Sequence, residues 1–299
     1  MRRLMICIVL AVGVLTATAL AQQDFGKVEI KVQQVAGNVY MLEGAGGNIG
    51  VSVGSDGVLI IDDQFAPLAD KIRAALKSIN PGPLKFVLNT HWHGDHTGGN
   101  PVFGREAAII AHDNVRKRLT GELKPATGNQ NAQPMAAEGL PVVTYAQSVS
   151  VHFNGEEIRV THFPKGHTDG DSVMLFTKSN VAHLGDDFFA GRFPFVDLSS
   201  GGSVEGLERN IGEVIRMLPA GVRIIPGHGP VSSLDDLKAY HQMLQETIGV
   251  VREQLKRKQP LEAVKKQGLP AKYKDWGSGF INTDRWIETI YKSLSPATK

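Results

Sequence analysis

Cysteine is almost absent from this sequence: the chain has one, Cys7, close to its amino terminus. Cys7 lies in a segment that we expect to be removed, so the mature chain is predicted to contain no thiol. This excludes disulfide bonds and cysteine-ligated metals. Any metal site must then use histidine and carboxylate ligands.

Long apolar runs are also scarce, and the longest, residues 4–20, follows Arg2 and Arg3. Ala19-Leu20-Ala21 then provides a small-residue cleavage pattern, which predicts a Sec-type signal peptide over residues 1–21, cleaved after Ala21. A transmembrane anchor is the alternative, but about 17 residues rich in alanine, glycine and threonine are marginal for crossing a bilayer. We therefore expect a periplasmic or secreted protein with no membrane attachment after cleavage.

An excess of charge of either sign is lacking as well. The formal net charge is +2, and the two arginines of the predicted signal peptide contribute to it. Since the chain has no basic stripe and no acidic tail, we expect no nucleic-acid partner. We expect a small-molecule substrate instead. The sequence indicates no particular oligomeric state.

Residues 22–299 alternate between strand-like and helical patterns without a dividing linker, which predicts a single domain. Strands are predicted within 27–61 and at 85–88, 107–111, 149–153, 157–162, 172–177, 181–184 and 222–225. Helices are predicted at 67–79, 113–119, 203–218 and 233–257. This order predicts an α/β fold with helices outside a pair of packed sheets.

Two segments stand apart from this alternation. Residues 121–141 are rich in glycine, proline, asparagine, glutamine and alanine, and a loop of this length is usually either a lid or disordered. Residues 260–299 are predicted to form a helical extension that covers the core, with no chemistry assigned to it.

The densest group of chemical side chains is His91-Trp92-His93-Gly94-Asp95-His96, directly after a predicted strand. Side chains two positions apart on an extended segment point the same way, so His91 and His93 can chelate one ion. The chain then turns at Gly94, which lets Asp95 and His96 face a second ion. Burying these polar groups without partners would be unfavourable, and their chemistry matches that of zinc ligands. The group predicts a metal centre, with Trp92 between the ligands packing into the core.

Three further motifs each follow a predicted strand: Gly166-His167-Thr168-Asp169, Leu184-Gly185-Asp186-Asp187 and Pro226-Gly227-His228-Gly229. The carboxyl ends of strands are where α/β folds gather functional groups. A single glycine-flanked histidine is more often a structural turn. Together with the first group, the three motifs favour one shared centre.

With these motifs in this order, the sequence resembles the metallo-β-lactamase-fold hydrolase superfamily over nearly all of residues 22–299. The resemblance implies a four-layer αββα sandwich with two metals at one edge of its sheets. It implies that Asp186 bridges the metals and that Asp62 orients a ligand histidine. The remaining implied ligands are His91, His93 and His167 for the first metal, and Asp95, His96 and His228 for the second.

These ligands suit two Zn²⁺ ions per chain. The expected reaction is attack of a metal-activated hydroxide on the carbonyl of a cyclic ester, thioester or amide, with Asp95 as the catalytic carboxylate that steers the proton. Lys165 and Arg192 are candidates for binding an anionic group of the substrate, although solvated surface charges are about as plausible a reading. His112 and His183 are candidates for supporting the ligands, and His241 is predicted to be exposed on a helix.

Several alternatives share this ligand set. The resembled β-lactamase subclasses carry cysteine or serine where this chain has Asp186, which favours a lactonase-like or thioesterase-like hydrolase. β-Lactam hydrolysis by an exported metallo-β-lactamase is the specific alternative. A second alternative is a sulfur dioxygenase with one iron ion on the same fold. A non-catalytic binding protein is disfavoured, because such a protein has no reason to keep every ligand.

Overall fold

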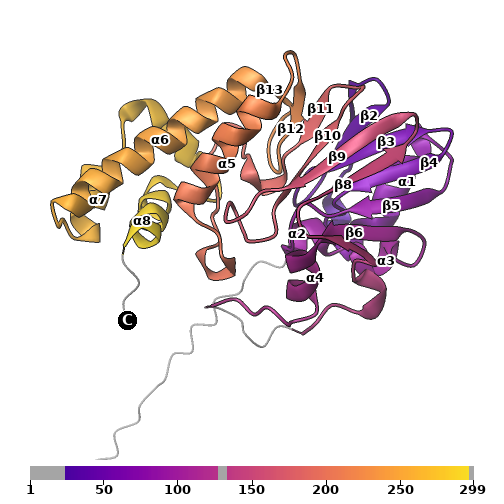
Figure 1. Cartoon of the computed structure of the whole chain (residues 1–299), viewed down its shortest axis with the longest axis horizontal. Helices are drawn as coiled ribbons and strands as arrows, with labels where there is room; N and C mark the ends of the chain where they lie inside the picture. Colours follow the sequence, from indigo (N-terminus) through magenta and orange to yellow (C-terminus); the bar gives the residue numbers. More distant parts are fainter. Residues whose placement is uncertain (1–23, 127–132, 296–299) are drawn as a thin grey trace, which may run out of the picture.

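The computed structural model describes residues 24–126 and 133–295 (Figure 1). The predicted signal peptide, residues 1–21, lies outside the described residues, and so does the middle of segment 121–141. Within the described part of the chain, no helix combines the length and apolar character needed to cross a membrane.

Two sheets form the centre of the described structure. The first has seven strands in sequential order: β1 (Lys31–Ala36), β2 (Val39–Glu43), β3 (Ile49–Gly54), β4 (Gly57–Ile61), β5 (Leu84–Leu88), β6 (Ala108–His112) and β7 (Val143–Tyr145). Strands β1 to β4 are antiparallel, and β4 to β7 are parallel. The parallel strands bring their carboxyl ends to one edge of the sheet.

The second sheet has six strands in the described residues. Their order is β13 (Ser232–Ser233), β12 (Arg223–Ile225), β11 (Val181–His183), β10 (Ser172–Phe176), β9 (Glu156–His162) and β8 (Ser148–Phe153). The pair β11–β12 is parallel and the other pairs are antiparallel.

Helices cover the outer side of each sheet (Figure 1). Between the sheets lies an apolar core to which both contribute, including Leu59, Ile61, Val160 and Phe176. The outer side of the first sheet packs on α1 (Ala69–Ile79), and that of the second packs on α5 (Val204–Met217), α6 (Leu234–Lys256) and α8 (Thr283–Leu294). The expected four-layer αββα sandwich is therefore confirmed.

The remaining helices are short. They are α2 (Gly94–Thr97), α3 (Asn100–Phe103), α4 (Asp113–Leu119) and α7 (Leu261–Gln267), with 3-10 turns η1 (Phe25–Lys27), η2 (Ala66–Leu68), η3 (Ala137–Gly139), η4 (Gly185–Asp187), η5 (Leu198–Ser200) and η6 (Ala271–Ser278). Helix α6 begins with a capping box, in which the side chains of Ser233 and Asp236 each accept a bond from the other's backbone amide. The capping box fixes the start of the longest helix of the outer layer.

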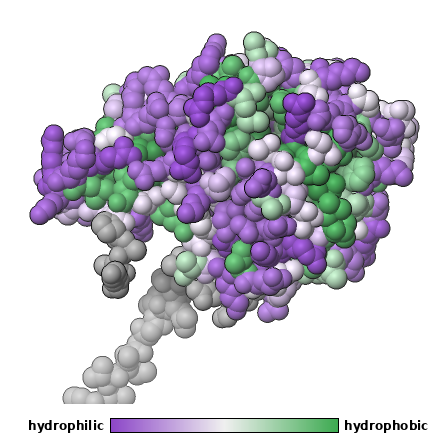
Figure 2. Space-filling view, viewed as in Figure 1, coloured by the Kyte–Doolittle hydropathy of each residue, from purple (hydrophilic) through white to green (hydrophobic). Residues whose placement is uncertain are grey.

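Most predicted elements are present, and the departures are local. In the segment 27–61, where strands were predicted, the first strand begins only at Lys31. Strand β7 and the turn η3 lie in a part of the chain where no regular element was predicted. Residues 260–295 hold α7, η6 and α8, of which α8 packs on α6 and α7 packs on α8. In α8, Trp286 is fully buried, and its Nε1 donates to Thr247 Oγ1 at 3.1 Å. The visible surface is mainly hydrophilic, with its hydrophobic residues gathered in separate patches (Figure 2).

Candidate metal centre

Four chain segments meet at the edge where strands of both sheets end. Strand β5 leads through Thr90 into the turn that carries His91 and His93, and α2 carries Asp95 and His96. The second sheet supplies the other three residues, which are His167 after β9, Asp186 after β11 and His228 after β12. The edge thus joins ligand groups from the two halves of the sandwich.

The first cluster consists of His91, His93, His167 and Asp186, whose ligand atoms all lie within 4.8 Å of one another. His93 Nδ1 lies 2.8 Å from His167 Nε2. Asp186 Oδ2 lies 3.5 Å from His167 Nε2 and 3.9 Å from His91 Nε2. One cation between these atoms could contact all four residues.

The second cluster consists of Asp95, His96 and His228, again within 4.8 Å of one another. Asp186 also reaches this cluster, because its Oδ1 lies 3.0 Å from His96 Nε2 and 3.4 Å from His228 Nε2. His228 Nε2 lies 3.3 Å from Asp95 Oδ2. The two oxygens of Asp186 therefore face different clusters, and the seven predicted ligands are brought together at one place.

The outward nitrogen of four imidazoles is held by a partner. These contacts are His91 Nδ1 with Thr90 Oγ1 at 3.0 Å, His93 Nε2 with Asp197 Oδ2 at 3.0 Å, His96 Nδ1 with Asp62 Oδ2 at 2.7 Å, and His167 Nδ1 with the Phe195 carbonyl at 2.7 Å. Such contacts fix the orientation of each ring and aim its other nitrogen at the clusters.

Asp62 is the residue that the sequence resemblance linked to ligand orientation, and it is fully buried beside His96. Its other bonds come from Thr90, whose backbone amide donates to Oδ1 at 2.8 Å and whose hydroxyl donates to Oδ2 at 2.7 Å. Its backbone φ is 62°, in the left-handed region that non-glycine residues rarely occupy. Asp62 thus ties the turn before His91 to the imidazole of His96.

At two glycines, the backbone lies directly against the side chain of a ligand residue. A Cβ at Gly47 would collide with the imidazole ring of His96, and a Cβ at Gly227 would collide with Asp186 Oδ1. Both positions therefore require glycine for close approach.

Burial and mutual charge set the protonation of the centre. Burial works against charge, but Asp186 and Asp95 raise the pKa of His228 to about 9. Burial likewise opposes ionisation of Asp186, yet His96 and His228 hold the pKa of that carboxyl well below its usual range. Burial lowers the pKa of His167 to about 4. Burial thus favours neutral imidazole at His167, whereas the neighbouring carboxylates favour imidazolium at His228.

The donor atoms fit a metal pair. His91 Nε2, His96 Nε2 and Asp186 Oδ1 are buried, and among the described residues they have no hydrogen-bond partner. Buried polar atoms without partners are unfavourable in a folded protein. Imidazole and carboxylate donors at these distances match the ligand chemistry of zinc and related divalent metals.

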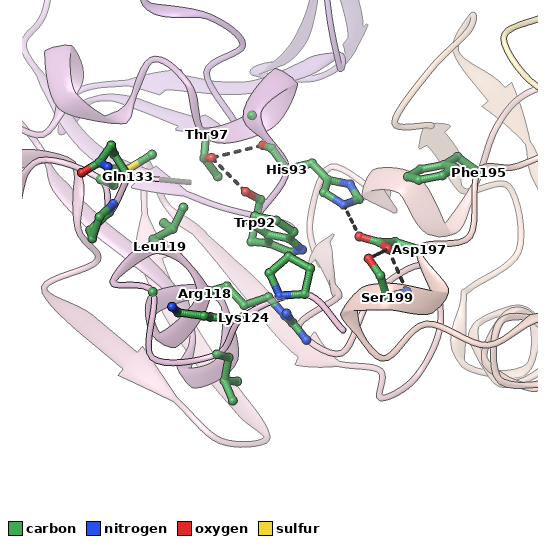
Figure 3. Close-up of a pocket in the computed structure, with 16 residues that line it drawn as sticks. Trp92, His93, Thr97, Arg118, Leu119, Lys124, Gln133, Phe195, Asp197 and Ser199 are labelled. Atoms are coloured by element: carbon green, nitrogen blue, oxygen red, sulfur yellow. Dashed lines mark hydrogen bonds and ion pairs between the residues drawn. The ribbon is translucent and has the colours of Figure 1, made fainter. Parts of the chain in front are cut away.

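Sequence reasoning did not identify Thr90 or Asp197. Thr90 directly precedes the histidine group, and this position is the only feature of the sequence that could have indicated a supporting role for it. Asp197 lies 104 residues from His93 in the chain, and no motif marks it. Figure 3 shows its contact with His93 at the wall of a cavity.

The other histidines lie outside the two clusters. His183 is buried, with Nε2 3.0 Å from the Asn48 carbonyl and Nδ1 accepting from the Gly185 amide, so it supports the turn before Asp186. His112 instead stacks on His162 at 3.6 Å. The prediction that His241 is exposed was wrong, because it is partly buried and its Nε2 lies 2.8 Å from Glu208 Oε1.

Two cavities meet at His93 and Phe195. A cavity of about 560 Å³ opens onto the ligands, and its lining includes Asp95, Asp186, His228 and Arg192. The other, about 500 Å³, is lined by Trp92, Arg118 and Asp197 among others (Figure 3). Trp92 is partly buried there, with the Arg118 guanidinium 5.7 Å from its ring. Lys165 is exposed and lines neither cavity.

The chain matches the model of one protein family and is similar, over part of its length, to several curated proteins. The family model of the metallo-beta-lactamase superfamily matches residues 33–228. A hydroxyacylglutathione hydrolase of Nitrosococcus oceani is 32% identical over 167 residues, 54% of this chain and 55% of that protein. An atrochrysone carboxyl ACP thioesterase of Claviceps purpurea is 29% identical over 131 residues, 43% of this chain and 36% of that protein. The matches span about half, or less, of the length of these curated relatives.

Solved structures show the same fold at low identity. A metallo-beta-lactamase from Pontibacter korlensis aligns with a TM-score of 0.59 at 18% identity, covering 73% of this chain and 99% of that one. A double mutant of the sec-alkyl sulfatase PisA1 aligns with a TM-score of 0.69 at 13% identity, covering 90% of this chain and 51% of that one.

Proposed function

The chain belongs to the metallo-beta-lactamase superfamily, and from this premise we propose that it is an exported hydrolase with two zinc ions that cleaves a cyclic ester, thioester or amide. The observation that carries the proposal is the placement of Asp186. Its Oδ2 faces His91 and His167, and its Oδ1 faces His96 and His228. A carboxylate shared in this way is suited to holding two cations side by side.

The first metal would be held by His91, His93 and His167, the second by Asp95, His96 and His228, with Asp186 between them. Bound zinc supplies Lewis acidity toward the substrate carbonyl and lowers the pKa of a coordinated water toward neutrality. The chain's own contribution is to fix the ligands, through Asp62, Thr90 and Asp197, and to bury them.

Asp95 is the carboxylate placed to move a proton. Its side chain is 31% exposed, against 5% for Asp186, and it lines the cavity that opens onto the ligands. Burial opposes its charge, but His96 and His228 lower the pKa of Asp95 to about 2. An ionised Asp95 can accept a proton at Oδ1 or Oδ2 from the attacking water and pass it to the leaving group.

The substrate class is supported by the cavity and by the relatives. A cavity of about 560 Å³ suits a small molecule. The hydroxyacylglutathione hydrolase and the carboxyl ACP thioesterase among the relatives favour an acyl substrate, with a thioester or an ester bond to be cleaved. Arg192, which lines the cavity, is the remaining candidate for binding an anionic group.

Metal analysis and a substrate screen test the proposal together. The purified mature protein is expected to contain two zinc ions per chain and to hydrolyse a lactone or a thioester. A content of one iron ion per chain would favour the sulfur dioxygenase instead, and turnover confined to β-lactams would favour the β-lactamase alternative. Asp186→Asn should lose both zinc ions, whereas Asp235→Asn, at a carboxylate that is 89% exposed on α6, should keep them.

Export is tested separately. Expression of the full chain should yield a periplasmic or secreted protein whose first residue, by mass spectrometry, is Gln22. Full-length protein retained in the cytoplasm would contradict the export part of the proposal and leave the metal chemistry untouched.

A further inference from the structure

The cavity over the ligands has an unusual division between polar and apolar walls. Its polar groups are the ligand side chains at one end and Arg192. The rest of the wall is apolar: Phe65, Phe189, Phe193, Phe195, Phe280 and Ile281. A substrate in this cavity would meet polar groups at its reacting bond and mainly aromatic rings elsewhere.

Two of these rings contact ligand imidazoles, and a third ring continues from one of them. Phe189 stacks on His228 with ring centroids 5.1 Å apart. The ring centroids of Phe195 and His167 lie 5.7 Å apart, and Phe280 meets Phe195 edge to face at 6.3 Å. The apolar wall therefore begins at the ligands and ends at Phe280, 74% of which is exposed.

Phe280 comes from the carboxyl-terminal segment, and that segment is fixed to the loop after Asp186. The Phe193 amide donates to the Trp276 carbonyl at 3.0 Å. Arg285 donates to the Phe280 carbonyl at 3.3 Å, and its guanidinium lies 4.8 Å from the Phe280 ring. An aromatic ring kept in place yet mostly in contact with water gains from being covered, because each Å² of apolar surface removed from water contributes about 25 cal/mol.

We infer that Phe280, with Ile281 and Phe195, selects acyl substrates that carry an apolar body, an alkyl chain of several carbons or an aromatic ring, beside the scissile carbonyl. The inference rests on the proposed function for its reaction, and it adds the substrate class. The carboxyl-terminal extension thereby contributes to specificity as well as to the outer helical layer.

The test compares short and long substrates that have the same reacting group. Wild-type protein is assayed with γ-butyrolactone against α-pentyl-γ-butyrolactone, and with acetyl against phenylacetyl thioesters of N-acetylcysteamine. The apolar partner of at least one pair should have a kcat/KM roughly tenfold higher or more, because a buried methylene contributes about 0.8 kcal/mol. A ratio below about twofold in every pair that is hydrolysed would overturn the inference and leave the proposed function standing.

Variants locate the effect. Phe280→Ser should lower the long-to-short ratio roughly fivefold, and Phe280→Leu should restore most of it, because leucine keeps an apolar wall. The control is Val142→Ser, at a residue that is 70% exposed and outside the cavity, which should leave the ratio unchanged. Equal ratios in wild type and Phe280→Ser would overturn the role of Phe280.

A binding measurement separates this inference from the hydrolase proposal. Metal-free protein is titrated with 4-phenylbutan-2-one and with butan-2-one, two ketones that cannot be hydrolysed, and binding is followed by saturation-transfer NMR. The phenyl compound should bind roughly tenfold more tightly, and Phe280→Ser should remove most of that preference. If no lactone or thioester is turned over, the hydrolase proposal fails. In that case, the absence of a preference between the ketones would overturn this inference as well.

Discussion

The metal-facing edge of the sheets and the contact between α6 and α8 are both buried, but different groups are buried in them. At the helical contact, Trp286 and Ile290 are fully buried, and the polar atom of Trp286 has its partner in Thr247. At the sheet edge, the inward atoms of His91 and His96 are also buried but have no hydrogen-bond partner among the described residues. The polar atom at the helical contact is thus paired by the chain itself, whereas the inward atoms at the sheet edge would gain partners from a bound cation.

Replacing Asp95 gives the largest expected effect on the metal-facing edge. Asp95→Ala removes a ligand oxygen and the proton acceptor, so kcat/KM should fall about a thousandfold or more. The fold should persist, since this side chain is 31% exposed. Steady-state kinetics and thermal unfolding of the variant check both statements, and Asp235→Ala on α6 serves as the control. An undiminished rate would remove Asp95 from the mechanism.

Replacing Trp286 tests the other side of the comparison. Trp286→Ala leaves a cavity between α6 and α8, so the free energy of unfolding should fall by about 3–5 kcal/mol. Zinc content per folded chain should not change. Trp286→Phe keeps an aromatic ring against Phe193, whose ring centroid lies 6.0 Å away, and should lose much less. Denaturant titration and metal analysis of the folded fraction provide the measurements, and metal loss without unfolding would show that the two regions are not independent.

The pH dependence of stability should differ in sign between the metal-free and zinc-loaded forms. Asp186 and Asp95 raise the pKa of His228 from 6.5 to about 9 despite burial. In the metal-free protein, this contribution to stability is full below pH 6.5 and is lost as the pH rises through 9. Zinc must displace that proton, so its affinity should fall by about tenfold per pH unit for each proton released as the pH drops from 9 to 6.5. Thermal unfolding of both forms across this range is the measurement, and parallel trends would contradict the assignment.

The smallest effect is expected at the surface of the helical layer. Lys292 and Lys265 lower the pKa of Glu288 to about 2, so its contribution is present above the usual pKa of a glutamate and is lost as the pH falls toward 2. Because the Glu288 side chain is 33% exposed, Glu288→Gln should cost less than about 1 kcal/mol. A loss above 2 kcal/mol, measured by urea denaturation at neutral pH, would mean that this ion pair is part of the packed core.

The sequence predicts those helices, strands and ligand groups that depend on residues close together in the chain. The strand pattern at 85–88 and the histidine group after it predicted β5 and the site edge, and the spacing at 233–257 predicted α6. Residues brought in by tertiary structure could not be found this way. Asp197 and Phe280 lie in irregular segments far from the ligand motifs, and only the packing of the 188–197 loop against the carboxyl-terminal segment places them at the cavities. His241 was misjudged for the same reason, because its partner Glu208 is on α5.

The division of the ligands between the two sheets has a consequence for how the protein matures. Residues 91–96 belong to the half of the chain that is synthesised first, and His228 emerges long after them. Neither half alone offers more than part of either coordination sphere, so a partly translated or misdocked chain should bind zinc weakly. Stable metal uptake would then report that the two halves have assembled, and the proposed activity would depend on that assembly.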